Sequence, residues 1–150
     1  MKNIFTKFTA LFTHLLVLAV VLEVTARYIF GKSSAAISDM EVYAFSVVIL
    51  FGGTVALFKN SHVNIDLLYG KMTNSHKKAV QIISVIFFLV PFCAVIIFSS
   101  YDYALTSFFL NEKSTDPGGL PYRFLLKSLI PLSFFALLAA GIKGIFEKKM

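Results

Sequence analysis

The sequence predicts an all-α integral membrane protein: a bundle of four transmembrane helices formed by one domain over residues 1–150. The chain is 57% hydrophobic and 15% charged, whereas a soluble domain carries about 25% charged residues. Its mean hydropathy is +0.79, so too little polar surface exists to cover a water-soluble globule. Three charge-to-charge intervals of 16 to 18 residues also recur, namely Lys7–Glu23, Glu41–Lys59 and Lys127–Lys143. Each corresponds to roughly 24–27 Å of helix, just under the ~30 Å hydrocarbon core of a bilayer.

The predicted spans cover residues 8–30, 39–58, 78–103 and 121–146. The first follows two lysines, but Arg27 and Lys32 precede any small-residue cleavage site, so we interpret it as a retained signal anchor. Pro91 and Pro131 should kink the third and fourth spans, because each proline frees a carbonyl one turn earlier. Pro121 suits the first turn of the last span, where a missing N–H costs nothing.

The connections between the spans differ in kind. Residues 31–38 form a small outer loop, and residues 104–120 form a second one in which Asp116-Pro117-Gly118-Gly119 predicts a type II turn. In the inner loop, residues 60–76, apolar side chains recur at helical spacing and predict a short amphipathic helix in the membrane interface. Gly52-Gly53 and the small pair Ala140 and Gly144 are expected to allow close helix contacts inside the protein.

The distribution of basic residues predicts the orientation in the membrane. With the N-terminus inside, nine lysines fall on the inner side and five lysines or arginines on the outer side. Basic residues concentrate on the cytoplasmic side of membrane proteins, so both termini are predicted to be cytoplasmic. Five of the six tyrosines then lie at the outer interface, as an aromatic belt requires: Tyr28, Tyr43, Tyr101, Tyr103 and Tyr122.

Several charged residues fall toward the outer side and are predicted to form one cluster, which comprises Glu23, Arg27, Glu41, Arg123 and Lys127. Charges at such depth must face protein or water and find a partner. Three interpretations remain open: the cluster fixes the helix bundle internally, it docks a partner protein, or Glu23 serves as a proton or cation site. Nearby bases outnumber the acids and should keep Glu23 ionised and paired, which disfavours the third interpretation.

The sequence lacks the residue patterns that other functional classes require. Lysines lie at helix ends without a basic stripe, so the net charge of +6 does not indicate nucleic-acid binding. His14 is the only histidine inside a span, so no pair could ligate a haem, and an anchor for a redox enzyme is disfavoured. The single cysteine, Cys93, excludes an intramolecular disulfide and a cysteine metal cluster. No catalytic constellation is evident, so we expect no enzyme activity, no metal site and no bound cofactor.

Several short motifs follow one another along the whole chain. In order they are Glu23-Val-Thr-Ala-Arg27-Tyr28, then Glu41, Gly52-Gly53, Lys59-Asn-Ser-His62-Val-Asn-Ile-Asp66, Asp116-Pro-Gly-Gly-Leu-Pro-Tyr-Arg123, Lys127 and Pro131. The inner-loop motif contributes His62 and Asp66. In their order and spacing these motifs resemble the small (Q-type) membrane subunit of tripartite ATP-independent periplasmic (TRAP) transporters, which implies a place in the bacterial inner membrane.

The resemblance implies a scaffold subunit of a sodium-coupled, binding-protein-dependent system for organic acid uptake. It implies three partners: a large multi-span membrane subunit that binds substrate and sodium, a periplasmic binding protein that docks transiently, and membrane lipid. The transported acid is left open among sialic acid, dicarboxylates, sugar acids and sulfonates. The alternative is a small homo-oligomeric, proton-coupled exporter that uses Glu23, and the asymmetric distribution of lysines argues against it.

Overall fold

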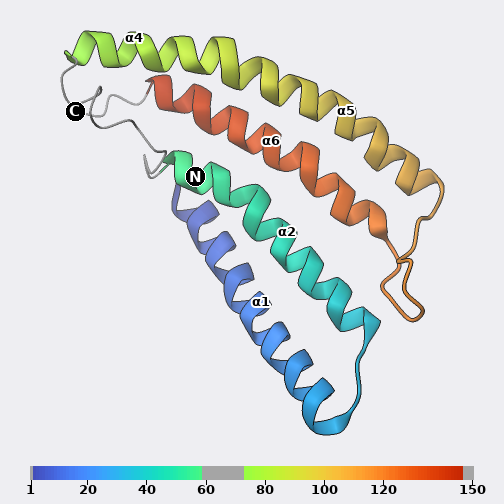
Figure 1. Cartoon of the computed structure of the whole chain (residues 1–150). Helices are drawn as coiled ribbons and strands as arrows, with labels where there is room; N and C mark the ends of the chain where they lie inside the picture. Colours follow the sequence, from blue (N-terminus) through green and yellow to red (C-terminus); the bar gives the residue numbers. More distant parts are fainter. Residues whose placement is uncertain (1, 59–72, 147–150) are drawn as a thin grey trace.

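The computed structural model describes residues 2–58 and 73–146 and shows long helices joined by short connections (Figure 1). The helices are α1 (Lys2–Phe30), α2 (Ala35–Phe58), α4 (Asn74–Ser84), η1 (Val85–Leu89), α5 (Val90–Phe109) and α6 (Arg123–Phe146). The described part of the chain contains no strand. The predicted all-α class is therefore confirmed, whereas the amphipathic helix predicted for residues 60–76 lies largely outside the described residues.

Four helical stretches of the described chain are long and apolar enough to cross a membrane: Asn3–Phe30, Ala35–Phe58, His76–Phe109 and Arg123–Phe146. Three of the four predicted C-terminal boundaries, at residues 30, 58 and 146, coincide with helix ends. The third span is longer than predicted, because α5 continues to Phe109 rather than ending at 103. The chain is therefore a multi-pass membrane protein, and the start of α1 and the end of α6 lie on the same side (Figure 1).

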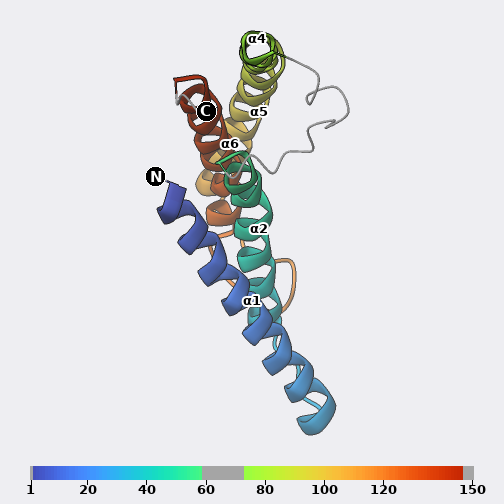
Figure 2. The same ribbon diagram turned by 90° about the vertical axis from the view of Figure 1, so that its left-hand side faces the viewer.

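The helices stand side by side in the order α1, α2, α6, α5, with α4 and η1 extending α5 (Figures 1 and 2). The extensive contacts join α1 to α2, α2 to α6 and α6 to α5. Within residues 2–58 and 73–146, no extensive contact joins α1 to α5, so the row of helices does not close into a ring. Most membrane-depth apolar side chains consequently remain exposed in the isolated chain.

The thin core consists largely of small side chains. Thr54, Cys93, Ser107 and Ser133 are the largest side chains that are completely buried. Small residues let helix backbones approach closely, which is the usual basis of helix association in membranes. Phe51 is the main aromatic exception, and its ring packs against those of Phe5 and Phe8 at 6.1 and 5.7 Å between centroids.

Glycine packing corrects one expectation. A Cβ added at Gly52 or Gly53 would meet no atom within 4 Å, so these glycines do not serve close packing inside the chain. Gly141 on α6 does, because a Cβ there would overlap the Leu89 side chain of η1. Ala140 is buried as expected, and Gly144 lies beside Gln81, which donates a hydrogen bond to its carbonyl at 3.1 Å.

The third span changes its helical form just before a proline. Residues Val85–Leu89 form a π-helical turn in which the N–H of Val90 donates to the carbonyl of Val85. Pro91 follows immediately and has no N–H to donate. The change from α-helical to π-helical form thus lies in the turn before Pro91, where the sequence predicted that the proline would free a carbonyl. Pro131, by contrast, lies inside α6 without ending it.

The connection from α5 to α6 contains the predicted turn but corrects the predicted helix start. Gly119 donates a hydrogen bond to the Asp116 carbonyl at 3.0 Å and Gly118 has φ +81°, as in a type II turn. Pro121, however, precedes the helix rather than occupying its first turn, because Tyr122 has φ 76° and α6 begins at Arg123. The left-handed backbone of Tyr122 is uncommon for a bulky residue.

Candidate functional site: the outer polar groups

Glu23 on α1 is the centre of the first polar group, which we call the hairpin group: Glu23, Arg27, Ser33, Ser38 and Glu41. Only 6% of Glu23 is exposed. Its Oε1 accepts hydrogen bonds from Arg27, from Ser38 Oγ at 3.0 Å and from Ser33 Oγ at 3.5 Å. These donors come from α1, from the connection and from α2, so one carboxylate joins both helices of the hairpin.

The turn between α1 and α2 brings these donors to the carboxylate. Gly31 adopts φ +62°, and the N–H of Lys32 returns to the carbonyl of Ala26 at 3.2 Å. A glycine with a positive φ is a common way to end a helix. Ser33 and Ser38 are thereby placed above the last turn of α1, within reach of Glu23.

Glu41 completes the hairpin group, but its carboxyl group has fewer hydrogen-bond partners than that of Glu23. Its carboxyl lies against that of Glu23, and its Oε1 is buried without a hydrogen-bond partner among the described residues. Arg27 forms an ion pair with Glu23 while 56% of its side chain remains exposed. The group therefore presents one guanidinium outward and keeps two carboxyl groups inward.

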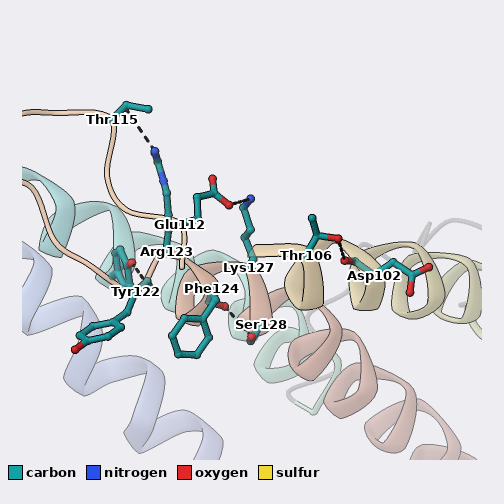
Figure 3. Close-up of polar contacts among 10 residues, drawn as sticks. Asp102, Thr106, Glu112, Thr115, Tyr122, Arg123, Phe124, Lys127 and Ser128 are labelled. Atoms are coloured by element: carbon teal, nitrogen blue, oxygen red, sulfur yellow. Dashed lines mark hydrogen bonds and ion pairs between the residues drawn. The ribbon is translucent and has the colours of Figure 1, made fainter. Parts of the chain in front are cut away.

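The second polar group, which we call the loop group, comprises Tyr103, Glu112, Thr115, Arg123 and Lys127. Figure 3 shows its members Glu112, Thr115, Arg123 and Lys127. Lys127 on α6 donates to Glu112 Oε2, and its Nζ lies 3.9 Å from the centroid of the Tyr103 ring. The lysine side chain is only 13% exposed. The hydrogen bond from Lys127 lowers the pKa of Glu112 below its usual value.

Arg123 closes the outer connection rather than pairing with an acid. Its Nη1 donates to Thr115 Oγ1 at 3.5 Å (Figure 3), and its backbone N–H donates to the carbonyl of Glu112 at 3.0 Å. Within the loop, the N–H of Ser114 donates to the Leu120 carbonyl at 3.1 Å. These bonds give residues 110–122 a defined shape at the outer end of α5 and α6.

The outer connection is also attached to α2. Asp39 Oδ2 accepts the N–H of Leu120 at 2.8 Å, and the Tyr43 hydroxyl donates to the Tyr122 carbonyl at 3.1 Å. A Cβ at Gly119 would lie 2.5 Å from Asp39 Oδ2, so only glycine fits this approach. A cavity of about 150 Å³ lies at this junction, and its polar lining comprises Ser38, Asp39, Tyr43, Ser114, Asp116 and Arg123.

The five charged residues predicted as one cluster thus fall into two groups. Glu23, Arg27 and Glu41 lie together in the hairpin group, whereas Arg123 and Lys127 belong to the loop group. Among the described residues, no ion pair joins the loop-group bases to Glu23 or Glu41, which corrects the expected arrangement. The reason is that Lys127 has a nearer acid, Glu112.

Sequence reasoning missed Glu112 and Asp39. Glu112 falls in the predicted outer loop, and the signal that points to it is the mostly apolar stretch from Ala104 to Leu110, which extends the helix toward it. Asp39 stands in the first turns of α2 and has no distinguishing pattern in the sequence. His62 and Asp66, from the predicted inner-loop motif, lie outside the described residues. No described group of three or more His, Cys, Asp or Glu residues is arranged to hold a metal ion.

Comparison with known families gives a match over most of the chain. Residues 16–148 match the family described as "Tripartite ATP-independent periplasmic transporters, DctQ component". The matched region includes both polar groups and reaches from α1 to the end of α6. A comparison with individual curated proteins finds no match.

Proposed function

Because this chain belongs to the DctQ component family of tripartite ATP-independent periplasmic transporters, we propose that it is the scaffold subunit of a sodium-coupled uptake system for organic acids. The DctQ component is part of a transporter, and its family is not an enzyme family. In the proposed complex it packs against a large membrane subunit, which binds substrate and sodium, and it helps a periplasmic binding protein to dock. The family match over residues 16–148 is the observation that carries this proposal.

The shape of the chain supports a scaffold role. Four spans in an open row bury few side chains against one another, and α1 is the least buried of them. Both sides of such a row offer apolar surface to a larger membrane partner. An apolar groove of about 460 Å³ over α1, α2 and α6 adds to this surface; Phe5, Phe51 and Phe135 are among its lining residues.

The outer connection supports a docking role. Residues 110–122 are held to α2 by Asp39 and Tyr43 and to α6 by Arg123, so the loop presents a defined surface. Lys113 and Asp116 lie on this loop, and both are exposed. Charges at the rim of an interface mainly steer encounter, which suits a soluble partner that docks and leaves. With both termini cytoplasmic in the inner membrane, as the lysine distribution indicates, this loop faces the periplasm.

The primary test is recovery of partners from native membranes. The tagged chain is purified in mild detergent, and co-purifying proteins are identified by mass spectrometry. A stoichiometric, very hydrophobic large subunit is expected, and uptake by vesicles reconstituted with that subunit and the binding protein should require this chain. Recovery of the chain alone as a homo-oligomer, with transport by the purified chain that depends on Glu23, would overturn the proposal in favour of the exporter.

Docking is tested separately by charge reversal. Asp116→Lys on the outer loop should change the affinity of the binding protein for the complex in nanodiscs and the dependence of that affinity on salt. Lys78→Glu, at the opposite end of the third span, is the matched control and should leave the affinity unchanged. Equal affinities for the parent and both variants would remove the outer loop from the docking surface.

A further inference from the structure

A histidine at membrane depth points away from the rest of the chain. His14 lies on α1, seven residues after Lys7 and 13 before Arg27, or about 10 and 20 Å along the helix. It is also nine residues from Glu23, which is two and a half turns, so the two side chains leave opposite faces of α1. Glu23 faces α2, and His14 is therefore exposed on the free edge of the row.

The hydrogen bond of His14 determines which ring nitrogen is left to bind a partner. Its Nδ1 lies 2.6 Å from the carbonyl of Ala10. A carbonyl only accepts, so Nδ1 carries the proton, and in the neutral ring Nε2 is left as an acceptor. Among the described residues Nε2 has no partner. A polar group without a partner in hydrocarbon is costly, and a charged ring at this depth would be more so.

The opposite edge of the row has a different character. Val95 on α5 is exposed and faces away from α6, nearly opposite the buried Cys93. No charged side chain or histidine occurs between Lys78 and Asp102, and Asp102 lies between Tyr101 and Tyr103 in the predicted outer aromatic belt. Phe92 and Phe98 are also exposed at membrane depth. This edge can face lipid without an unsatisfied ionisable group.

We propose that the α1 edge around His14 is the surface that binds the large membrane subunit, through a helix that places a hydrogen-bond donor opposite Nε2. The donor is a hydroxyl, a side-chain amide or a basic group, because Nε2 accepts. Exposed Leu11, Leu18 and Val21 surround His14 and supply the apolar part of the contact. The α5 edge around Val95 then faces lipid. This inference rests on the proposed function, since it requires that a large subunit exists.

Photo-crosslinking in the assembled complex tests the orientation. The photoreactive residue p-benzoylphenylalanine is placed at position 14 or, as a control at comparable depth on the other edge, at position 95. Position 14 should crosslink to the large subunit, and position 95 should not. Crosslinks from position 95 but not from position 14 would overturn the assignment while leaving the scaffold function intact. Failure of the parent chain to recover any large subunit would instead sink the proposed function.

Substitution of His14 tests the hydrogen bond itself. Interhelical hydrogen bonds in membranes predict that His14→Leu raises the dissociation constant of the two subunits in detergent about threefold to twentyfold. His14→Gln, whose amide oxygen can still accept, should retain most of the affinity. Helix content of each isolated variant should match the parent, since His14 is exposed there. Parent-like affinity of His14→Leu would exclude the proposed hydrogen bond.

Discussion

At the scale of single residues, buried charge is accommodated by local partners. Lys127 lies on a membrane-spanning helix, yet its ammonium group has an acid, Glu112, and an aromatic face, Tyr103, within contact distance. Glu23 similarly gathers Arg27, Ser33 and Ser38. A charge near the hydrocarbon edge is tolerated when it finds such partners inside the protein. Each group therefore stabilises the pair of helices that contributes to it.

Removal of the Lys127 charge should weaken the contact between α5 and α6. For Lys127→Met, loss of the contact with the Tyr103 ring alone is expected to cost about 0.5–2 kcal/mol of stability. Thermal unfolding of the purified chain in detergent measures this as a lower Tm. Lys78→Met, a lysine at the other end of the third span, is the control and should unfold like the parent. An unchanged Tm for Lys127→Met would mean that the loop group does not stabilise the chain.

Glu112 predicts a dependence of stability on pH. Its pKa is lowered in the folded chain, chiefly by the hydrogen bond from Lys127, relative to about 4.3 when unfolded. A lowered pKa stabilises the fold fully above the unfolded value, and this contribution disappears as the pH falls through the folded value. We expect the Tm to decrease below about pH 4 in the parent, with a smaller decrease in Glu112→Gln. Parallel curves for the two proteins would contradict the assignment.

At the scale of elements, one close approach within the helix row involves three spans. A Cβ added at Gly141 of α6 would overlap the Leu89 side chain of the π-helical turn and would lie 3.8 Å from the Leu57 side chain. The π-helical turn, Gly141 of α6 and Leu57 at the end of α2 therefore lie close together. Gly52 and Gly53, although they read as a helix-contact motif, face open space in this chain.

Leucine substitutions distinguish the two glycine positions. Gly141→Leu should destabilise the isolated chain by about 1–3 kcal/mol, because added volume in a packed interface forces neighbouring side chains to move. Gly53→Leu, at an open position, should leave the stability of the isolated chain within about 0.5 kcal/mol of the parent. Denaturant or thermal unfolding in detergent compares them. Equal effects of both substitutions would show that the inner contact is not tightly packed.

At the scale of the whole molecule, an even number of spans places both ends of the chain on one side. Cysteine labelling in whole cells checks this arrangement and its direction. Lys113→Cys, on the outer connection, should react with a membrane-impermeant maleimide in intact cells, whereas Lys78→Cys should react only after permeabilisation. Cys93 is completely buried and should give no background. The reverse labelling pattern would mean that the lysine distribution predicts the wrong orientation.

The arrangement of the helices also leaves much of the apolar surface of the isolated chain uncovered. Its helices form a row whose two edges, the α1 edge with His14 and the α5 edge with Val95, both lack a protein neighbour. This shape agrees with the proposed scaffold role, in which the row of helices adds width to a partner. The polar groups lie near the predicted outer end of the helices instead of the membrane midplane, where transport sites usually lie.

The sequence by itself determined the class of the protein, its four spans and the residues that carry its charges. Span length and apolar composition respond to a single physical requirement, the thickness of the bilayer, so they can be read without knowing any contact. The type II turn was equally predictable, because proline and glycine restrict or free their own backbone. Helix ends at Phe30, Phe58 and Phe146 followed from the charges and breakers that come after the apolar runs.

Only the tertiary structure decided which charges meet and which glycines are packed. Lys127 pairs with Glu112 and not with Glu23 because α6 packs between α2 and α5, an order that periodicity does not contain. Gly141 is packed and Gly53 is open for the same reason. The position of His14 in an apolar run indicates no function, but the structure shows that His14 lies on an uncovered edge of the row. Pair contacts depend on helix order and rotation, and those arise from packing of the whole chain rather than from any local segment.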